Sequence, residues 1–193
     1  MSTVILAEKP DQARDYAAAF KKSTKKNGYI EVEDSRFFTG KAFITWGFGH
    51  LVELAEPKAY KEEWAKWNLK DLPIFPEKFK FQVAEDKKKQ FNIVKKLLKE
   101  SSEIIIATDP DREGENIARS IINLAGASNK PTKRLWANSL LPEPLRKAFA
   151  DLKDGKDYVN MYVEAQTRQI SDWLVGMNLS RLYTLLLQGQ GVH

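Results

Sequence analysis

Residues 104–122, IIIATDPDREGENIARSII, change abruptly from apolar to acidic and then to amphipathic. Three isoleucines at 104–106 form a β-branched run of the length typical of a buried strand. Acidic residues follow at alternate positions, namely Asp109, Asp111 and Glu113. Gly114 can adopt the conformations of a tight turn, and apolar residues recur at helical spacing from about Glu115 onward. The stretch therefore predicts a strand, an acidic turn and a helix.

The acidic turn predicts a site for a hard cation. Carboxylates this close repel one another by about 1 kcal/mol per pair at 4 Å in water, and a bound cation removes that cost. Because the donors are all oxygens, Mg²⁺ held with waters and substrate phosphates is the expected ion. An EF-hand is excluded, because Ser120 takes the place of its bidentate Glu and a strand precedes the loop. A solvated acidic loop without a ligand stays the alternative.

The N-terminus repeats this design. Residues 3–7, TVILA, form a second β-prone run, followed by Glu8 and Lys9, and Pro10 suits the first turn of a helix. Ligands of open parallel sheets bind beyond the carboxyl ends of the strands. If the two strands are neighbours, Glu8 joins Asp109, Asp111 and Glu113 in one cluster beside the Lys9 ammonium.

Strands and helices alternate over the first three quarters of the chain. The expected strands cover residues 3–7, 29–33, 36–46 with a hairpin between 38 and 42, 79–83, 104–106 and 134–136. The expected helices cover residues 10–20, a segment around 91–98, the segment after 115, residues 142–152 and 158–187. The basic stretch 21–26 is expected to be a solvated loop. This alternation predicts a three-layer α/β domain with a mainly parallel central sheet and a helical extension.

Several motifs resemble those of the type IA DNA topoisomerases, most closely the topoisomerase III branch. They are AEKP at 7–10, WGFGHLVE at 46–53, AYKEEWAKWNLKDLPIFPEKF at 59–79, DPDREGE at 109–115, KRLWANSLLPE at 133–143 and EAQTRQISDWLVGMNLSRLYT at 164–184. The resemblance covers the whole chain in order and in spacing. It implies a Toprim (Rossmann-like) domain at residues 1–154. Residues 155–193 would begin a helical DNA-groove domain, broken or bent near Gly176.

The resemblance also implies a mechanism. These enzymes cleave one DNA strand, pass another strand and reseal the break. Glu8 would act as general acid and base at the ribose 3'-oxygen, with a place among the metal ligands, and Lys9 would stabilise the scissile phosphate. Asp109, Asp111 and Glu113 would hold Mg²⁺. The nucleophilic tyrosine of the family has no matching sequence context here, so we expect an N-terminal piece, inactive alone, whose partners are the remaining domains of the parent enzyme.

Single-stranded DNA is the expected substrate and partner. Trp67 is either a core residue or a platform on which a base stacks. Arg168 and Asp172 are four residues apart, so they either pair with each other or line the DNA groove. The resemblance also assigns Arg112, Gly176 and Arg181 to DNA binding and places the GH turn near the active site, although His50 is as well explained by a structural role. Two alternatives remain, a non-catalytic module that binds single-stranded DNA and another Toprim nuclease or primase-like protein.

Composition narrows the remaining choices. The chain has 193 residues, no cysteine and a formal charge of +5. Disulfides and cysteine zinc sites are therefore excluded, and the charge is compatible with a polyanionic partner. No apolar run approaches the ~20 residues of a membrane span. We expect a cytoplasmic, nucleoid-associated protein with no membrane contact.

Overall fold

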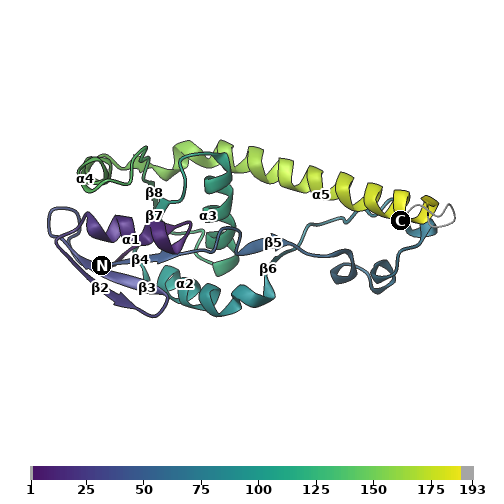
Figure 1. Ribbon diagram of the computed structural model, residues 1–193, viewed down its shortest axis with the longest axis horizontal. Coiled ribbons are helices and arrows are strands. Elements are labelled where there is room, and N and C mark those ends of the chain that lie inside the picture. Colours follow the sequence, from purple (N-terminus) through teal and green to yellow (C-terminus); the bar gives the residue numbers. More distant parts are fainter. Residues whose placement is uncertain (1, 188–193) are drawn as a thin grey trace. The chain divides into compact units, whose positions relative to one another are not determined.

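A computed structural model describes residues 2–187 of the chain. Its largest element is a seven-stranded sheet with the order β2-β3-β4-β1-β7-β8-β9 (Figure 1). The strands of this sheet are β1 Ser2–Ala7, β2 Lys22–Lys26, β3 Tyr29–Glu33, β4 Lys41–Trp46, β7 Glu103–Ala107, β8 Thr132–Arg134 and β9 Lys153–Asp154. A separate two-stranded sheet consists of β5 Val52–Leu54 and β6 Phe81–Val83. The α-helices are α1 Pro10–Ala18, α2 Lys88–Glu100, α3 Arg112–Ala125, α4 Pro142–Ala150 and α5 Val159–Leu187.

The four central strands, β4, β1, β7 and β8, are parallel. Antiparallel strands flank them, β3 and β2 on one side and β9 on the other. In β1, Val4 pairs with Phe43 of β4 and with Ile104 of β7, so β1 lies at the centre of the sheet. The expected mainly parallel central sheet is confirmed. As a result, the segments that follow β1 and β7 leave the same edge of the sheet side by side.

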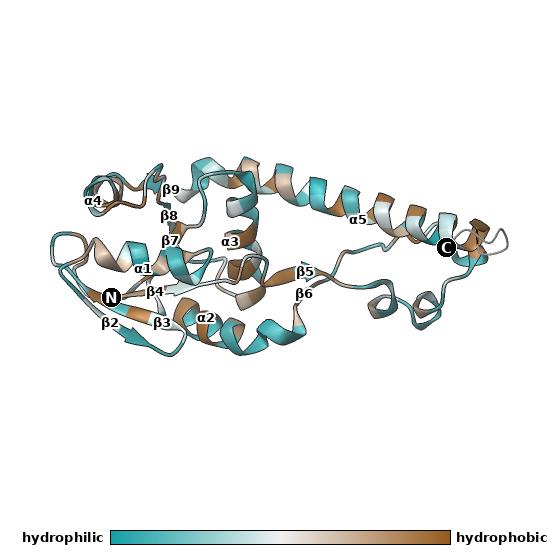
Figure 2. Cartoon of the chain, in the orientation of Figure 1, coloured by the Kyte–Doolittle hydropathy of each residue, from teal (hydrophilic) through white to brown (hydrophobic). Residues whose placement is uncertain are grey.

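Helices cover both faces of the sheet. On one face, Ile5 and Ala7 of β1 join a buried cluster with Tyr16 of α1 and Phe149 of α4. Because strand side chains alternate between faces, the intervening positions of β1 face the other side, where α2 lies opposite α1 (Figure 1). Figure 2 shows hydrophobic residues along one side of α2 and hydrophilic residues along the other. The expected three-layer α/β architecture is therefore confirmed.

Two local expectations are wrong. Residues 22–26 form β2, an edge strand with every residue exposed, whose Lys22 and Lys26 pair with Glu33 and Glu31 of β3. Lysines are common on edge strands because they oppose pairing with another chain, so a basic composition did not indicate a loop. Residues 36–40 are not a strand, because Asp34 accepts hydrogen bonds from the Arg36 backbone and guanidinium and turns the chain. Strand β9 was not expected at all.

The contacts divide the chain into two compact units. The first comprises residues 1–52 and 83–165 and contains the large sheet. The second comprises residues 53–82 and the chain from Gln166 onward. Within it, Asn178 of α5 exchanges hydrogen bonds with the backbone of Ile74, at 2.6 and 3.0 Å. The expected domain boundary after Asp154 stays a prediction.

The expected helix at 158–187 is α5, which runs through Gly176 without a break. Residues 188–193, the end of the expected extension, lie outside the described residues. Across residues 2–187, no helix has the length and apolar character that crossing a membrane requires.

Candidate active site

The carboxyl ends of β1 and β7 bring Glu8, Lys9 and Asp109 together. Ala7 pairs with Ala107 at the ends of the two strands. The Lys9 ammonium lies 3.6 Å from a Glu8 carboxylate oxygen and 3.7 Å from an Asp109 carboxylate oxygen. The Asp109 backbone N–H donates to the Glu8 carboxylate at 3.3 Å. Residues 101 positions apart thus form one site, at the sheet edge where parallel α/β sheets bind ligands.

The other two acidic residues have separate surroundings. Asp111 caps α3, because its carboxylate accepts a hydrogen bond from the Gly114 N–H at 2.7 Å. Glu113 lies exposed in the first turn of α3, beside Arg112, which contacts Glu164 at 2.6 Å. Within residues 2–187, no three acidic or histidine side chains converge closely enough to hold a metal by themselves. The carboxylates therefore lie along one edge without forming a closed cage.

Gly114 fixes the shape of the acidic turn. A Cβ atom at this position would lie 2.2 Å from the carbonyl oxygen of Asp109 and 2.9 Å from its nitrogen. The Thr108 hydroxyl also donates to the Gly114 carbonyl at 2.7 Å. The turn folds back onto the first turn of α3 only because residue 114 has no side chain.

Gln12, in α1, was not identified from the sequence. Its amide oxygen accepts from the Glu8 N–H at 2.8 Å, and its amide nitrogen donates to the Asp109 carboxylate at 2.8 Å. The side chain is buried and joins the two halves of the site. The available signal was its position, because Gln12 lies in the first turn of α1, which begins at Pro10, only four residues after Glu8.

Arg134 holds the backbone of the acidic turn through hydrogen bonds and, like Gln12, was not identified from the sequence. Its fully buried guanidinium donates to the carbonyls of Thr108 at 2.9 Å and Asp109 at 2.5 Å. Its Nε lies 3.0 Å from buried Glu115, which also accepts from Arg119 at 2.7 Å. Burial raises the pKa of Glu115 and lowers the pKa of Arg134, while their opposite charges act against both shifts.

A sequence signal for this network exists in α3. Glu115 occupies the same helical face as Ala118 and Ile122, which are buried. A carboxylate on an apolar helix face requires a buried cation, and Arg134 provides it. Tyr16 completes the support by donating to the Ala107 carbonyl at 2.8 Å, and burial raises the pKa of its phenol.

The GFGH loop borders the site, as expected for the GH turn. The Gly49 N–H donates to the Glu8 carbonyl at 3.2 Å, and the Gly47 N–H donates to the Ala7 carbonyl at 3.1 Å. Gly49 has a φ of 65°, which favours glycine. The His50 side chain is exposed, while its carbonyl accepts from Lys87 at 2.9 Å.

The expected DNA-binding residues of the second unit have varied surroundings. Trp67 is 46% exposed, and the Arg181 guanidinium carbon lies 5.4 Å from its ring centroid. Arg181 itself is only 4% exposed and donates to the Trp64 carbonyl at 2.8 Å, and burial lowers its pKa. Arg168 pairs with Asp172 at 3.6 Å on an exposed face of α5. Buried Arg181 thus packs against the indole ring of Trp67. The expected contact of Arg181 with a DNA phosphate stays a prediction.

Comparison with known proteins identifies the domain. The Toprim domain family matches residues 3–140. The chain is 45% identical over 190 residues to DNA topoisomerase 3 of Bacillus anthracis, with 97% of this chain and 25% of that protein covered. It is 44% identical over 190 residues to DNA topoisomerase 3 of Bacillus subtilis, with the same coverage. The homologous protein of Staphylococcus epidermidis is 45% identical over 193 residues, covering 98% of this chain and 26% of that protein.

A solved structure shares the fold. Full-length topoisomerase I from Thermotoga maritima superposes with a TM-score of 0.53 at 21% identity, covering 94% of this chain and 25% of that one. The chain thus spans about a quarter of the length of the relatives it matches. With a family match over most of its length and a sheet of the corresponding kind, this chain belongs to the Toprim domain family.

Proposed function

We propose that this chain is the metal- and phosphate-binding part of a type IA DNA topoisomerase that cleaves, passes and religates single DNA strands. The observation that carries the proposal is the meeting of Glu8, Lys9 and Asp109 at the ends of β1 and β7. Relatives that are 44% to 45% identical and named DNA topoisomerase 3 support it. In this proposal residues 1–154 are the Toprim domain and residues 155–193 begin the DNA-groove domain.

Glu8 and Lys9 perform the chemistry assigned to this chain. The Glu8 side chain is 12% exposed, and its carboxylate is oriented by the Asp109 N–H. It gives a proton to the ribose 3'-oxygen on cleavage and takes it back on religation. The Lys9 side chain is 53% exposed, so its ammonium can meet a phosphate and stabilise the charge that develops there.

Mg²⁺ is the proposed cofactor, held by carboxylates chosen from Glu8, Asp109, Asp111 and Glu113. The residues fit this ion, because Mg²⁺ is usually bound by one or two carboxylates together with waters and substrate phosphates. A closed cage of three side chains is not required. The Lys9 ammonium lies 3.6 Å from Glu8 and 3.7 Å from Asp109, and this pairing with both carboxylates supports the proposal of a position that favours positive charge. When bound, the ion supplies charge stabilisation to the reacting phosphate.

Single-stranded DNA is the proposed substrate. Bases stack on exposed Trp67, which Arg181 holds in place, and Arg168 and Arg112 offer exposed guanidinium groups to phosphates. Asp172 orients Arg168, and Gly176 presents a helix surface without a side chain. The further domains of a longer topoisomerase are the proposed protein partners, and a cytoplasmic, nucleoid-associated location follows from the substrate.

Thermal melting with and without millimolar Mg²⁺ tests the metal site. A ligand that binds only the folded state at 100 times its Kd adds about 2.7 kcal/mol to stability, so the melting temperature should rise. The variant Asp109→Asn with Asp111→Asn should lose this rise, and Asn at 111 still caps α3. The matched control is Glu31→Gln with Glu33→Gln, which removes two carboxylates in exposed ion pairs on β3. A full Mg²⁺ shift in the first variant would refute the assignment.

A denaturing gel tests the reaction. Labelled single-stranded DNA is incubated with the protein expressed from its complete gene, with and without Glu8→Gln. We expect a covalent protein–DNA adduct whose formation and reversal are strongly slowed by Glu8→Gln, while DNA binding is retained. Binding without any cleavage would favour the alternative, a single-stranded DNA-binding module without chemistry. Cleavage without religation would favour a Toprim nuclease.

A further inference from the structure

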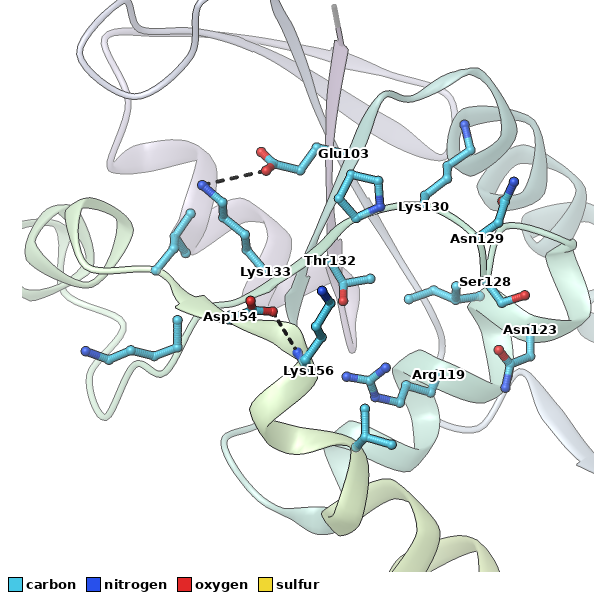
Figure 3. A pocket seen from close by; sticks show the side chains of 15 residues that line it. Glu103, Arg119, Asn123, Ser128, Asn129, Lys130, Thr132, Lys133, Asp154 and Lys156 are labelled. Carbon is cyan, nitrogen blue, oxygen red and sulfur yellow. Dashed lines mark hydrogen bonds and ion pairs between the residues drawn. The ribbon is translucent and has the colours of Figure 1, made fainter.

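A pocket lies in the first unit, away from the acidic turn. It has a volume of about 770 Å³, within the range of about 300–1,000 Å³ that small-molecule sites occupy (Figure 3). Glu103 and Thr132, the first residues of β7 and β8, line it, whereas Asp109 lies two residues beyond the last residue of β7. The pocket is therefore at the opposite end of these strands from Glu8 and Asp109. None of its lining residues belongs to the proposed catalytic site.

The lining is cationic. Two carboxylates, Glu103 and Asp154, and five cations line the pocket, namely Arg119, Lys130, Lys133, Lys153 and Lys156. Arg119 and Lys153 also pair with carboxylates outside the lining, Glu115 and Asp151. The remaining lysines still outnumber the two lining carboxylates by one, and a concave surface concentrates the resulting field on an anion.

Several of these cations are held in place by the protein. Arg119 contacts Glu115 at 2.7 Å and donates to the Gly155 carbonyl at 2.5 Å. Lys130 donates to the carbonyl of Lys99 at 2.6 Å. Lys133 is only loosely paired with Glu103, at 3.6 Å (Figure 3). Arg119 and Lys130 are thus preorganised, whereas Lys133 and Lys156 have exposed side chains that can turn toward a ligand.

The pocket also has an apolar part and a closely packed edge. Ile122, Leu152 and Val159 contribute apolar surface beside the charged groups. A Cβ atom at Gly155 would lie 2.3 Å from the Thr132 hydroxyl oxygen, so glycine is needed for the chain to pass this close to β8. Cations, amide and hydroxyl groups such as Asn123 and Ser128, and an apolar wall suit a phosphate joined to a partly apolar group.

We propose that this pocket binds a nucleotide unit. The phosphate meets Lys133 and Lys156, and the sugar or base lies against Ile122, Leu152 and Val159. A free nucleotide and a nucleotide within a strand share this chemistry. The site extends beyond the proposed function, because it neither contacts nor requires the carboxylates at the ends of β1 and β7.

Fluorescence anisotropy with two probes tests the proposal, namely dye-labelled adenosine diphosphate and a dye-labelled oligodeoxythymidine. Lys133→Ala with Lys156→Ala should raise the Kd of the bound probe about tenfold, which corresponds to about 1.4 kcal/mol. The matched control is Lys22→Ala with Lys25→Ala on β2, which removes the same charge and likewise breaks one exposed ion pair. The control should change the Kd by less than about twofold.

Each outcome is decisive. Diphosphate binding that the Lys133→Ala with Lys156→Ala variant weakens identifies a free nucleotide, and oligonucleotide binding that the same variant weakens, without diphosphate binding, identifies a strand. Equal loss in both lysine pairs, no loss in either, or no binding of either probe would overturn the proposal. Amide shifts in NMR spectra should change at Asn123 and Asn129. The same shifts should persist in the variant Asp109→Asn with Asp111→Asn, so that failure of the catalytic proposal is told apart from failure of this one.

Discussion

The Nε atom of Arg134 lies 3.0 Å from a carboxylate oxygen of Glu115, and both side chains are fully buried. Arg134 donates from the same guanidinium to the carbonyls of Thr108 and Asp109. The pair therefore joins α3 to β8 and supports the backbone that carries the acidic turn. A buried ion pair contributes little net stability compared with apolar residues, but removal of one partner leaves an uncompensated charge.

Glu115→Gln should destabilise the protein by about 3 to 5 kcal/mol, because Arg134 and Arg119 then lose the carboxylate that they share. Urea denaturation followed by circular dichroism measures the free energy of unfolding. The control is Glu143→Gln, which breaks an exposed pair with Arg146 and should cost less than about 1 kcal/mol. Similar losses in the two variants would show that the buried network is not needed.

Two glycines in helices should respond to alanine with opposite signs. Gly114→Ala places a Cβ 2.2 Å from the Asp109 carbonyl oxygen and should cost about 1–3 kcal/mol or more, since backbone must move. Gly176→Ala lies in the interior of α5, where its Cβ would lie within 4 Å of no described atom beyond the adjoining helix backbone, and it should stabilise by up to about 1 kcal/mol. Urea denaturation of the native protein and of each variant measures these changes in the free energy of unfolding. A neutral Gly114→Ala would mean that the acidic turn is not tightly fixed.

Local patterns predicted the meeting of Glu8 and Asp109, because apolar strands followed by acidic residues obey the rule for parallel sheets. For Asp111 and Glu113, a place among the metal ligands stays a prediction. Their alternate spacing suggests one shared direction, but α3 begins at Arg112, so the helical period carries Asp111 to a cap and Glu113 to solvent. Spacing alone does not reveal where strand geometry ends.

Arg134 and Gln12 were missed for a different reason. Local signals pointed to a buried partner for Glu115 and to Gln12 beside Glu8, but the contacts of Arg134 and Gln12 with Asp109 span 25 and 97 positions, and no local pattern specifies them. Edge strand β2 was mistaken for a loop because its lysines look the same in both settings. Its assignment as a strand rests on pairing with β3.

The acid limit of stability should depend on Asp34. Hydrogen bonds from Arg36 hold the pKa of this buried carboxyl well below its usual range, even though burial acts in the opposite direction. A depressed folded-state pKa stabilises the protein above the unfolded value of about 3.9, and this contribution is lost as the pH falls below about 4. Urea denaturation at pH 7, 5, 4 and 3 should show this loss in the native protein.

Asp34→Asn should be less stable at pH 7 and show a flatter decline below about pH 4. Asp151→Asn, which breaks an exposed pair with Lys153, serves as the control and should keep the native profile. Parallel acid profiles for the native protein and Asp34→Asn would remove Asp34 from this role.

Trp67 and Arg168 should contribute to binding of single-stranded DNA in different ways. Trp67→Ala removes a stacking surface worth about 1 to 3 kcal/mol per base and should weaken binding at every salt concentration. Arg168→Ala removes about one phosphate contact, so the slope of the logarithm of affinity against the logarithm of salt concentration should become shallower by about one. Arg181→Ala should resemble Trp67→Ala, because Arg181 is buried beneath the indole.

Lys58→Ala is the control, since Lys58 also pairs with an acidic neighbour on the surface of the same unit. Anisotropy of a labelled oligonucleotide over a salt series provides both quantities. If Arg168→Ala and Arg181→Ala leave affinity and slope at the native values, α5 does not bind DNA through these residues.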